Sequence, residues 1–183
     1  MNKPDYAAAQ KNRKNKLISE IETLIREVKR DDVPVCAEVI KKSFMTVADE
    51  FGFTMKNAPG FTAFAATEDK LYWQMDNEPR RMFVYDLEGI VCGCYSLLMQ
   101  DNNECEINYL AVLPEYRHQG IGKQLLEHAY ETAEKQGCKL VNIGIVEENK
   151  RLRNWYEKSG AVHTGTRKYE FFPFTCGYMV KEL

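Results

Sequence analysis

The stretch LPEYRHQGIGKQLLEHA, from Leu113 to Ala129, places two glycines directly before a helical pattern. Pro114 interrupts a strand-like segment, Gly120 and Gly122 follow, and apolar residues then recur at helical spacing. Such a turn presents several backbone N–H groups with little side chain in the way, at the positive end of a helix dipole. The sequence therefore predicts an anion site in the turn that starts this helix.

Two well-known phosphate-binding sequence patterns do not fit this turn. A P-loop has the form GxxxxGK[ST], but Arg117 stands at its first glycine and Gln124 at its last position. The dinucleotide fingerprint GxGxxG keeps its first two glycines, whereas Leu125 takes the place of the third. On these residues alone, a turn that only starts a helix remains the alternative.

Strand and helix patterns alternate along the rest of the chain. Asp31-Asp32-Val33-Pro34 is typical of a helix start, and this helix is expected to end near Phe51-Gly52. Residues 16–30 fit both a helix and a strand. The other expected elements are a loop over 53–66, a helix over 68–75, strands over 82–85, 90–99 and 104–112, a helix ending at Gly137, a strand over 139–146, a helix over 149–160, and an antiparallel pair over 162–170 and 176–183. This order predicts an α/β fold with a mixed sheet.

The expected strand ECEINYLAV, just before the turn, has a period of two. Its more polar face is expected to carry Glu104, Glu106, Asn108 and Leu110. Its opposite face is expected to carry Cys105, Ile107, Tyr109 and Ala111.

The composition excludes several classes of protein. The net charge of −2 does not suggest a nucleic-acid-binding surface. No run approaches the roughly 18 apolar residues of a membrane span, and the basic N-terminal residues lack the apolar core of a signal peptide. The six cysteines show no CxxC or paired-histidine pattern, so free thiols are expected rather than a metal site. We therefore expect a cytoplasmic protein with no metal, no nucleic-acid partner and no membrane contact.

The segment AVLPEYRHQGIGKQLLEHA resembles the Arg/Gln-x-x-Gly-x-Gly/Ala motif of the GNAT superfamily of acyl-CoA-dependent N-acetyltransferases. A second segment, NKRLRNWYEKSGA, is similar to the family's Asn-x6-Tyr-x3-Gly-Phe segment, with Asn149, Tyr156 and Gly160 in register. Ala161 stands where phenylalanine is usual, which concerns packing more than chemistry. The segments FGFTMKNAPGFTAF and FPFTCGYM also resemble an uncharacterised bacterial-type subgroup of the superfamily.

The resemblance covers residues 22–183 and implies the GNAT fold, which is a central mixed, mostly antiparallel sheet flanked by helices, with splayed central strands. Residues 1–21 are expected to form an N-terminal extension, partly flexible or helical. The implied cosubstrate is acetyl-CoA, with its pyrophosphate at the turn and its pantetheine arm along the preceding strand. The implied binding residues are Leu110, Ala111, Val112, Arg117, His118, Gln119, Gly120, Ile121, Gly122, Lys123, Asn149 and Tyr156.

The implied reaction is attack of an amine on the thioester, and it needs a base because an alkyl amine with a pKa of about 10.4 is mostly protonated at neutral pH. Glu106 lies where some family members carry a glutamate base, and an exposed strand carboxylate is the alternative. Tyr156 is the predicted general acid toward the leaving thiolate, and a core aromatic is the alternative. Asn149 fits both a helix cap and a cofactor contact. Lys123 fits both a phosphate contact and a solvated helix residue.

The sequence leaves the acceptor open. A primary amine of a small molecule is favoured, with a protein N-terminus or a lysine side chain as the alternative. A noncatalytic acyl-CoA-binding module would need neither Glu106 nor Tyr156. A closed pocket between residues 53–66 and 171–176 would favour the small amine, and an open groove would favour a protein. A homodimer is compatible with the sequence.

Overall fold

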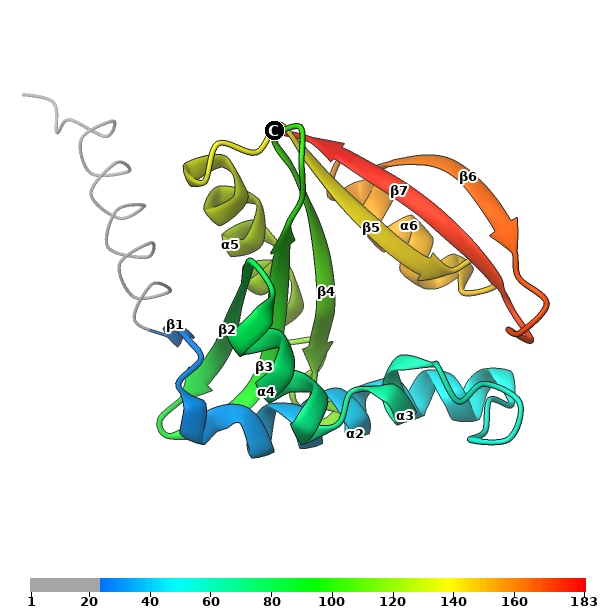
Figure 1. The fold of residues 1–183 in the computed structure, drawn as a ribbon, viewed down its shortest axis with the longest axis horizontal. Coiled ribbons are helices and arrows are strands. Elements are labelled where there is room, and N and C mark those ends of the chain that lie inside the picture. The colour runs from blue at the N-terminus through cyan, green and yellow to red at the C-terminus, as the bar shows by residue number, and fades with distance from the viewer. Residues whose placement is uncertain (1–23) are drawn as a thin grey trace, which may run out of the picture.

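The computed structural model describes residues 24–183, so the expectations for the extension 1–21 and for the domain boundary lie outside the described residues. The elements are, in chain order, β1 (Ile25–Glu27), α2 (Val33–Phe51), α3 (Thr62–Ala65), α4 (Glu68–Asn77), β2 (Arg80–Leu87), β3 (Ile90–Met99), β4 (Glu104–Val112), α5 (Ile121–Lys135), β5 (Leu140–Val146), α6 (Lys150–Lys158), β6 (Val162–Lys168) and β7 (Thr175–Glu182). Within the described part of the chain the strands form one sheet in the order β1-β2-β3-β4-β5-β7-β6 (Figure 1).

The first long helix, α2, begins and ends where the sequence predicts. A proline lies in its first turn, and Gly52 ends it in the left-handed region with φ of 69°, donating its amide N–H to the carbonyl of Ala48. The ambiguous segment before α2 forms a strand in its described part, where Ile25 pairs with Tyr85 of β2. The expected loop over 53–66 contains one helical turn, α3.

The sheet is antiparallel except between β4 and β5, which confirms the predicted mixed sheet. These two strands pair only from Glu104–Leu140 to Ile107–Ile143. Beyond this point β4 continues to Val112 and β5 to Val146, but the two strands no longer pair with each other and they diverge (Figure 1). The predicted splay of the central strands is therefore present, and it opens a gap in the middle of the sheet.

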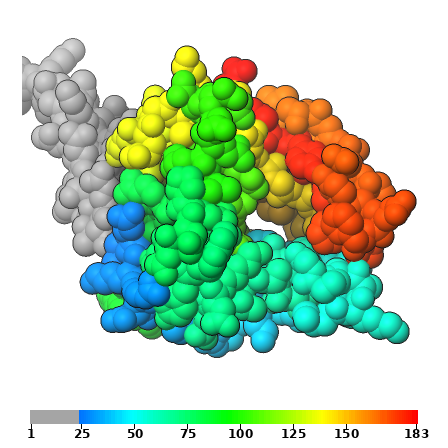
Figure 2. All heavy atoms as spheres, viewed as in Figure 1, coloured from blue at the N-terminus to red at the C-terminus, as the bar shows by residue number. Residues whose placement is uncertain are grey.

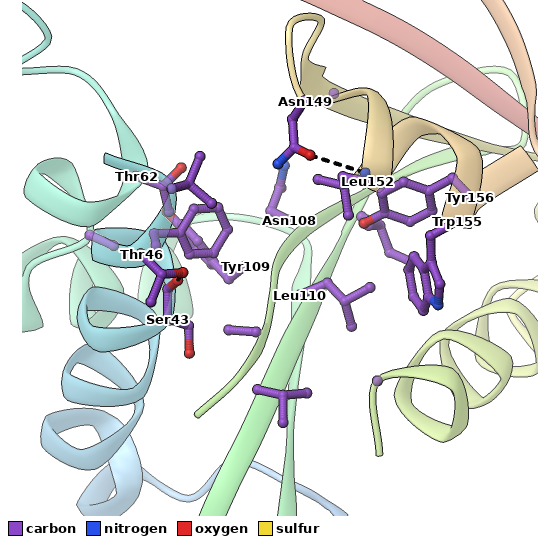
Figure 3. A pocket seen from close by; sticks show the side chains of 18 of the residues that line it. Ser43, Thr46, Thr62, Asn108, Tyr109, Leu110, Asn149, Leu152, Trp155 and Tyr156 are labelled. Carbon is purple, nitrogen blue, oxygen red and sulfur yellow. Dashed lines mark hydrogen bonds between the residues drawn. The ribbon is translucent and has the colours of Figure 1, made fainter. Parts of the chain in front are cut away.

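A bulge in β4 corrects the predicted alternation of that strand. Cys94 pairs with Ala111 and Ser96 pairs with Asn108, so two residues of β4 face one residue of β3. The bulged Tyr109 has φ of 57° and leaves the face shared by Cys105 and Ile107. Its hydroxyl donates instead to Oε1 of the buried Gln74 on α4 at 2.9 Å. Because the side-chain period is two, one extra residue reverses the faces beyond it, and Tyr109 and Leu110 point to opposite sides in Figure 3.

Helices cover both faces of the N-terminal half of the sheet, with α5 on one face and α2 and α4 on the other (Figure 1). Neighbouring residues of β3 show this arrangement. Tyr95 is hydrogen-bonded to His128 of α5 at 2.6 Å, whereas Cys94 lies near Cys36 of α2. No helix among the described residues is long and apolar enough to cross a bilayer.

A cluster of phenylalanines joins the two halves of the sheet across the gap. The ring of Phe174, before β7, lies 4.9 Å from that of Phe53 and 5.9 Å from that of Phe61. Phe172 stacks on Phe174 and lies against Gly60, where a Cβ would come within 3.3 Å of its ring. We call Phe53, Phe61, Phe172 and Phe174 the aromatic bridge. It connects the loop after α2 to the β6–β7 connection.

A charged cluster fixes α6 on the C-terminal hairpin. Glu147, between β5 and α6, accepts hydrogen bonds from Lys150 Nζ at 2.6 Å and Arg153 Nη1 at 2.9 Å, and it lies 2.9 Å from His163 Nε2 of β6. These bonds, that of Lys150 foremost, lower the pKa of Glu147 to about 2. The helix that carries the second sequence motif is thereby held beside the gap.

Candidate active site

A cavity of about 810 Å³ lies where β4 and β5 diverge. Figure 2 shows the surface hollowed between β4 and the β6–β7 hairpin, above α2 and α3. Residues of α2, α3 and α4 line it on one side, β4 lines its middle, and α6 and the turn before α5 line the other side (Figure 3). The cavity therefore brings together both sequence motifs, which lie about 30 residues apart in the chain.

The turn before α5 has the backbone that its sequence predicts. His118 and Gly120 both adopt the left-handed region, with φ of 63° and 85°. Helical geometry leaves the amides of Ile121, Gly122 and Lys123 without an acceptor inside the helix. None of these three amides donates to a backbone carbonyl elsewhere in residues 24–183. The turn thus offers unpaired donors at the positive end of a 15-residue helix.

The predicted residues of the turn divide into two groups. The first group lines the cavity and, besides Arg117, consists of His118, Gly120, Gly122 and Lys123. The second group, Gln119 and Ile121, does not line it. Lys123 is exposed and lies 3.6 Å from Glu127, so both of its predicted roles remain compatible with its position. Ile121 is buried in the core, and the side chain of Gln119 donates to the carbonyl of Glu115 at 3.4 Å. Only the backbone of Ile121 and Gln119 is therefore available to a ligand, and their contact with the cofactor stays a prediction.

Arg117 lines the cavity, and its guanidinium is held by three protein acceptors. It donates to the carbonyl of Val112 at 3.1 Å, to Thr46 Oγ1 at 3.1 Å and to the carbonyl of Ser43 at 2.9 Å. Burial, together with the positive charge of Arg151, lowers the pKa of Arg117 from its usual value. Arg117 therefore ties the turn to the end of β4 and to α2, and its contact with a pyrophosphate stays a prediction.

The last part of β4 presents a free edge to the cavity. The three strand residues predicted to hold the cofactor, Leu110, Ala111 and Val112, all line it. Pairing with β5 has already ended at Ile107, so this edge has no strand partner on the β5 side. Extended backbone at a free strand edge can bind an extended ligand through main-chain hydrogen bonds.

The predicted base, Glu106, lines the cavity near the last paired residues of β4. Its Oε1 accepts a hydrogen bond from Asn108 Nδ2 at 2.8 Å, and its Oε2 accepts one from Gln100 Nε2 at 3.2 Å. Among the described residues it forms no ion pair within 4.0 Å, so no cation competes for its lone pairs. Glu104, two residues earlier, does not line the cavity and accepts from Asn142 of β5 at 2.8 Å.

The predicted acid, Tyr156, is 5% exposed and lines the cavity from α6. Figure 3 shows its hydroxyl oxygen pointing into the space between α6 and β4. Burial raises the pKa of Tyr156 well above its usual value of 10, so the hydroxyl stays protonated at neutral pH and can donate. The ring is therefore part of the core while the hydroxyl faces the cavity, and the role of Tyr156 as the general acid stays a prediction.

Asn149 caps α6 as predicted and also lines the cavity, so its contact with a cofactor stays a prediction. Its Oδ1 accepts from the amide of Leu152 at 3.0 Å and caps α6 (Figure 3). The side chain is buried and lines the cavity, and its Nδ2 extends toward β4 in Figure 3. A capped, buried amide is thus available to a ligand.

Sequence reasoning missed a second set of cavity residues on α2, α4 and β2. The most buried charged side chain among them is Arg80, of which 4% is exposed. An arginine at the start of a strand looks like an ordinary surface residue in the sequence, so no local signal marks it. The others that carry polar groups into the cavity wall include Ser43, Thr46 and Gln74.

Comparison with known proteins identifies the family of this chain. The family model described as Acetyltransferase (GNAT) family matches residues 49–161. The chain is similar to an uncharacterized N-acetyltransferase in the pepI 3' region of Lactobacillus delbrueckii subsp. lactis, with 29% identity over 147 residues, which are 74% of this chain and 82% of that protein. Several other curated relatives match over shorter stretches, and the chain spans 19% to 60% of their lengths.

Solved structures show the same fold. A PaiA N-acetyltransferase from Thermoplasma acidophilum, in complex with coenzyme A, superimposes with a TM-score of 0.72 over 87% of this chain and 98% of that chain, at 20% identity. The ribosomal-protein-S18-alanine N-acetyltransferase from Escherichia coli superimposes with a TM-score of 0.68 over 86% of this chain and 92% of that chain, at 18% identity. The family model matches more than half of the residues, both predicted motifs lie at one cavity, and the central strands are splayed. The chain therefore belongs to the GNAT acetyltransferase family.

Proposed function

We propose that the protein transfers the acetyl group of acetyl-CoA to a primary amine of a small molecule by direct attack. The donor would place its pyrophosphate at the unpaired amides of Ile121 to Lys123 and its pantetheine arm along the free edge of β4. Both features lead into the same cavity, which is large enough for an extended cofactor arm and a second substrate. The PaiA structure, which contains coenzyme A, supports this placement through its shared fold.

The proposed mechanism uses one carboxylate and one hydroxyl. Glu106 takes a proton from the ammonium of the acceptor through a water molecule, and the free amine attacks the thioester carbon. The C–N bond forms, the nitrogen of the tetrahedral intermediate loses its second proton to solvent, and the intermediate then collapses with cleavage of the C–S bond. Tyr156 donates its proton to the departing sulfur, and solvent reprotonates the phenolate. The two groups lie on β4 and α6, on either side of the point where the strands diverge.

The aromatic bridge is the observation that carries the choice of a small acceptor. Phe53 and Phe61 contact Phe174 across the gap, so the loop after α2 and the β6–β7 connection meet rather than leave a groove. A protein segment would have to separate these rings to run across the site. The Phe61–Phe174 pair is edge-to-face, and such a pair contributes about 0.5–1.5 kcal/mol. The bridge therefore favours a free small molecule over a polypeptide.

An acceptor screen with labelled acetyl-CoA tests this proposal. The panel contains two classes of acceptor. The first consists of small amines, namely amino acids, polyamines, amino sugars and simple alkyl amines. The second consists of peptides with a free N-terminus or an internal lysine. We expect turnover with a small amine and none above background with the peptides. Turnover with peptides alone would contradict the proposal, as would the absence of transfer by a protein that binds acetyl-CoA in calorimetry, which would indicate a noncatalytic module.

Tyr156→Phe is expected to lower kcat at least about tenfold, which is roughly 1.4 kcal/mol in the barrier. The substitution removes the proton donor and keeps the ring that packs beside Trp155. Folding and acetyl-CoA affinity should therefore stay near their wild-type values, as measured by thermal unfolding and calorimetry. Steady-state kinetics with the amine found in the screen gives kcat.

Tyr130→Phe is the matched control for this prediction. Tyr130 lies on α5, and its buried hydroxyl has no hydrogen-bond partner among the described residues. Its removal should leave kcat unchanged and cost no stability, because an unpaired buried hydroxyl contributes no bond. If both variants reacted at the wild-type rate with chemistry rate-limiting, Tyr156 would be a packing residue only.

A further inference from the structure

The guanidinium of Arg80 lies in the wall of the cavity, next to the side chains that contact Glu106. Arg80 opens β2, and its Nε donates to Glu78 Oε2 at 2.6 Å. Its Nη1 donates to Ser96 Oγ at 2.8 Å and to Asn108 Oδ1 at 2.7 Å. With only 4% of the side chain exposed, these bonds fix the guanidinium in one position.

The bond from Arg80 determines which way the Asn108 amide faces. A guanidinium has donors only, so it selects Oδ1 of Asn108 as its partner. The amide must then direct Nδ2 away from Arg80, and this group donates to Oε1 of Glu106 at 2.8 Å. A rotated amide would bring its oxygen against the carboxylate, which would repel it. Arg80 and Glu106 are thus connected through a single amide with a defined orientation.

We propose that Arg80 is a positioning residue for acetyl transfer, which acts through Asn108 to hold the Glu106 carboxylate toward the acceptor amine. This inference rests on the proposed function, since it takes Glu106 as the base. The ion pair with Glu78 offsets the charge of the guanidinium, so its effect on Glu106 is carried by the oriented hydrogen bond. The bulge at Tyr109 lies directly beyond Asn108, and the guanidinium carbon of Arg80 lies over the ring of Tyr109, 5.7 Å from its centroid.

The remaining polar neighbours of Glu106 come from three strands or their ends. Gln100, after β3, donates to Oε2 at 3.2 Å, and it accepts from Asn142 of β5 at 3.1 Å. Glu104 is the other carboxylate on the same face of β4, and it is bound by the same Asn142. The hydrogen bond from Gln100 to Glu106 is exposed and longer than the one from Asn108. The bond from Asn108, which Arg80 holds in place, is therefore the one that orients the carboxylate.

A double-mutant cycle tests whether Arg80 acts through Glu106. Arg80→Met and Asn108→Ala should each lower kcat about tenfold and leave the KM for acetyl-CoA within about twofold, because only the base is misplaced. In a Glu106→Gln background both changes should have no further effect on kcat. Arg81→Met is the matched control, since Arg81 is the next residue of β2, does not line the cavity and pairs with Glu27 at 3.0 Å. It should leave kcat unchanged.

Carbon NMR of protein labelled at the glutamate carboxyl carbons gives a readout that needs no acceptor. The Glu106 signal is the one lost in Glu106→Gln, and its chemical shift at neutral pH reports on the hydrogen bonds to the carboxylate. Because the Asn108 amide donates to this carboxylate in the orientation that Arg80 selects, Arg80→Met and Asn108→Ala should both change this chemical shift, and Arg81→Met should not. Asn108→Ala leaves the Arg80–Glu78 ion pair intact, so it carries the test even if Arg80→Met fails to fold.

The outcomes separate the two proposals. If Glu106→Gln lowers kcat but the Arg80 and Asn108 variants react at the wild-type rate, the role of Arg80 is refuted and the base assignment stands. Equal losses in the wild-type and Glu106→Gln backgrounds would also refute it, because independent effects add. If Glu106→Gln itself reacts at the wild-type rate, the base assignment fails and the inference fails with it.

Discussion

Gly120→Val is expected to weaken acetyl-CoA binding at least about a hundredfold in a protein that stays folded. Gly120 caps α5 with φ of 85°, and a β-branched residue strongly disfavours that region, at a cost of about 1–2 kcal/mol or more. The chain would relieve this strain by rotating the peptide groups of the turn, which turns the amides of Ile121 and Gly122 away from the pyrophosphate. A Cβ at Gly120 has room, since its nearest neighbour is Gln124 Nε2 at 3.7 Å, so backbone conformation rather than collision is the cause.

Gly137→Val is the control, because Gly137 follows the other end of α5 with φ of 82° and a Cβ there meets nothing within 4 Å. It carries a similar backbone penalty away from the cavity, so it should lower the melting temperature and leave the affinity for acetyl-CoA unchanged. Calorimetry with acetyl-CoA measures both variants. Wild-type affinity in folded Gly120→Val, or an equal loss in both variants, would show that the turn does not hold the donor.

Glu106→Gln is expected to lower kcat by about 10²–10⁴-fold, the usual effect of removing a general base. Glutamine keeps the shape of the side chain and an oxygen that can accept from Asn108, but it cannot take a proton from the amine. The defect should shrink as the pH rises, since a larger fraction of an amine with a pKa of about 10.4 is then already deprotonated. The measurement is kcat against pH with the acceptor found in the screen.

Glu104→Gln is the matched control for the base. Glu104 lies two residues earlier on the same face of β4, yet it does not line the cavity and is bound to Asn142 of β5. Its substitution should change kcat little at any pH. A defect in Glu106→Gln that does not depend on pH would indicate a positional role for the carboxylate and leave water as the base.

Several features of the fold could be predicted because short-range patterns encode them. The proline in the first turn and the terminal Gly52 set the limits of α2, and apolar residues at helical spacing set the buried face of α5. The two motifs place Gly120, Asn149 and Tyr156 at the cavity, and the resemblance they carry implied the splay between β4 and β5. These features depend on residues that lie within a few turns of one another.

Other features depend on contacts that no local pattern encodes. Tyr109 adopts φ of 57° although tyrosine does not favour it, because the pairing of β4 with β3 and the bond to Gln74 hold it there. The strict alternation predicted for β4 is therefore wrong beyond Asn108. Three of the donors of Arg117 bind Ser43, Thr46 and Val112, contacts that no local pattern predicts, and its expected contribution of charge at the anion site stays a prediction.

The sequence by itself determined the family, the two motifs and the order of the elements, because glycine conformations, helix caps and apolar periodicity act between residues near in the chain. The tertiary structure alone decided which side chains surround the predicted base and which segments enclose the acceptor. Arg80 meets Asn108 across 28 residues, and Phe53 meets Phe174 across more than a hundred. Such contacts form only when the pairing of the strands brings distant segments to the same gap. No periodic pattern in the sequence therefore predicts them.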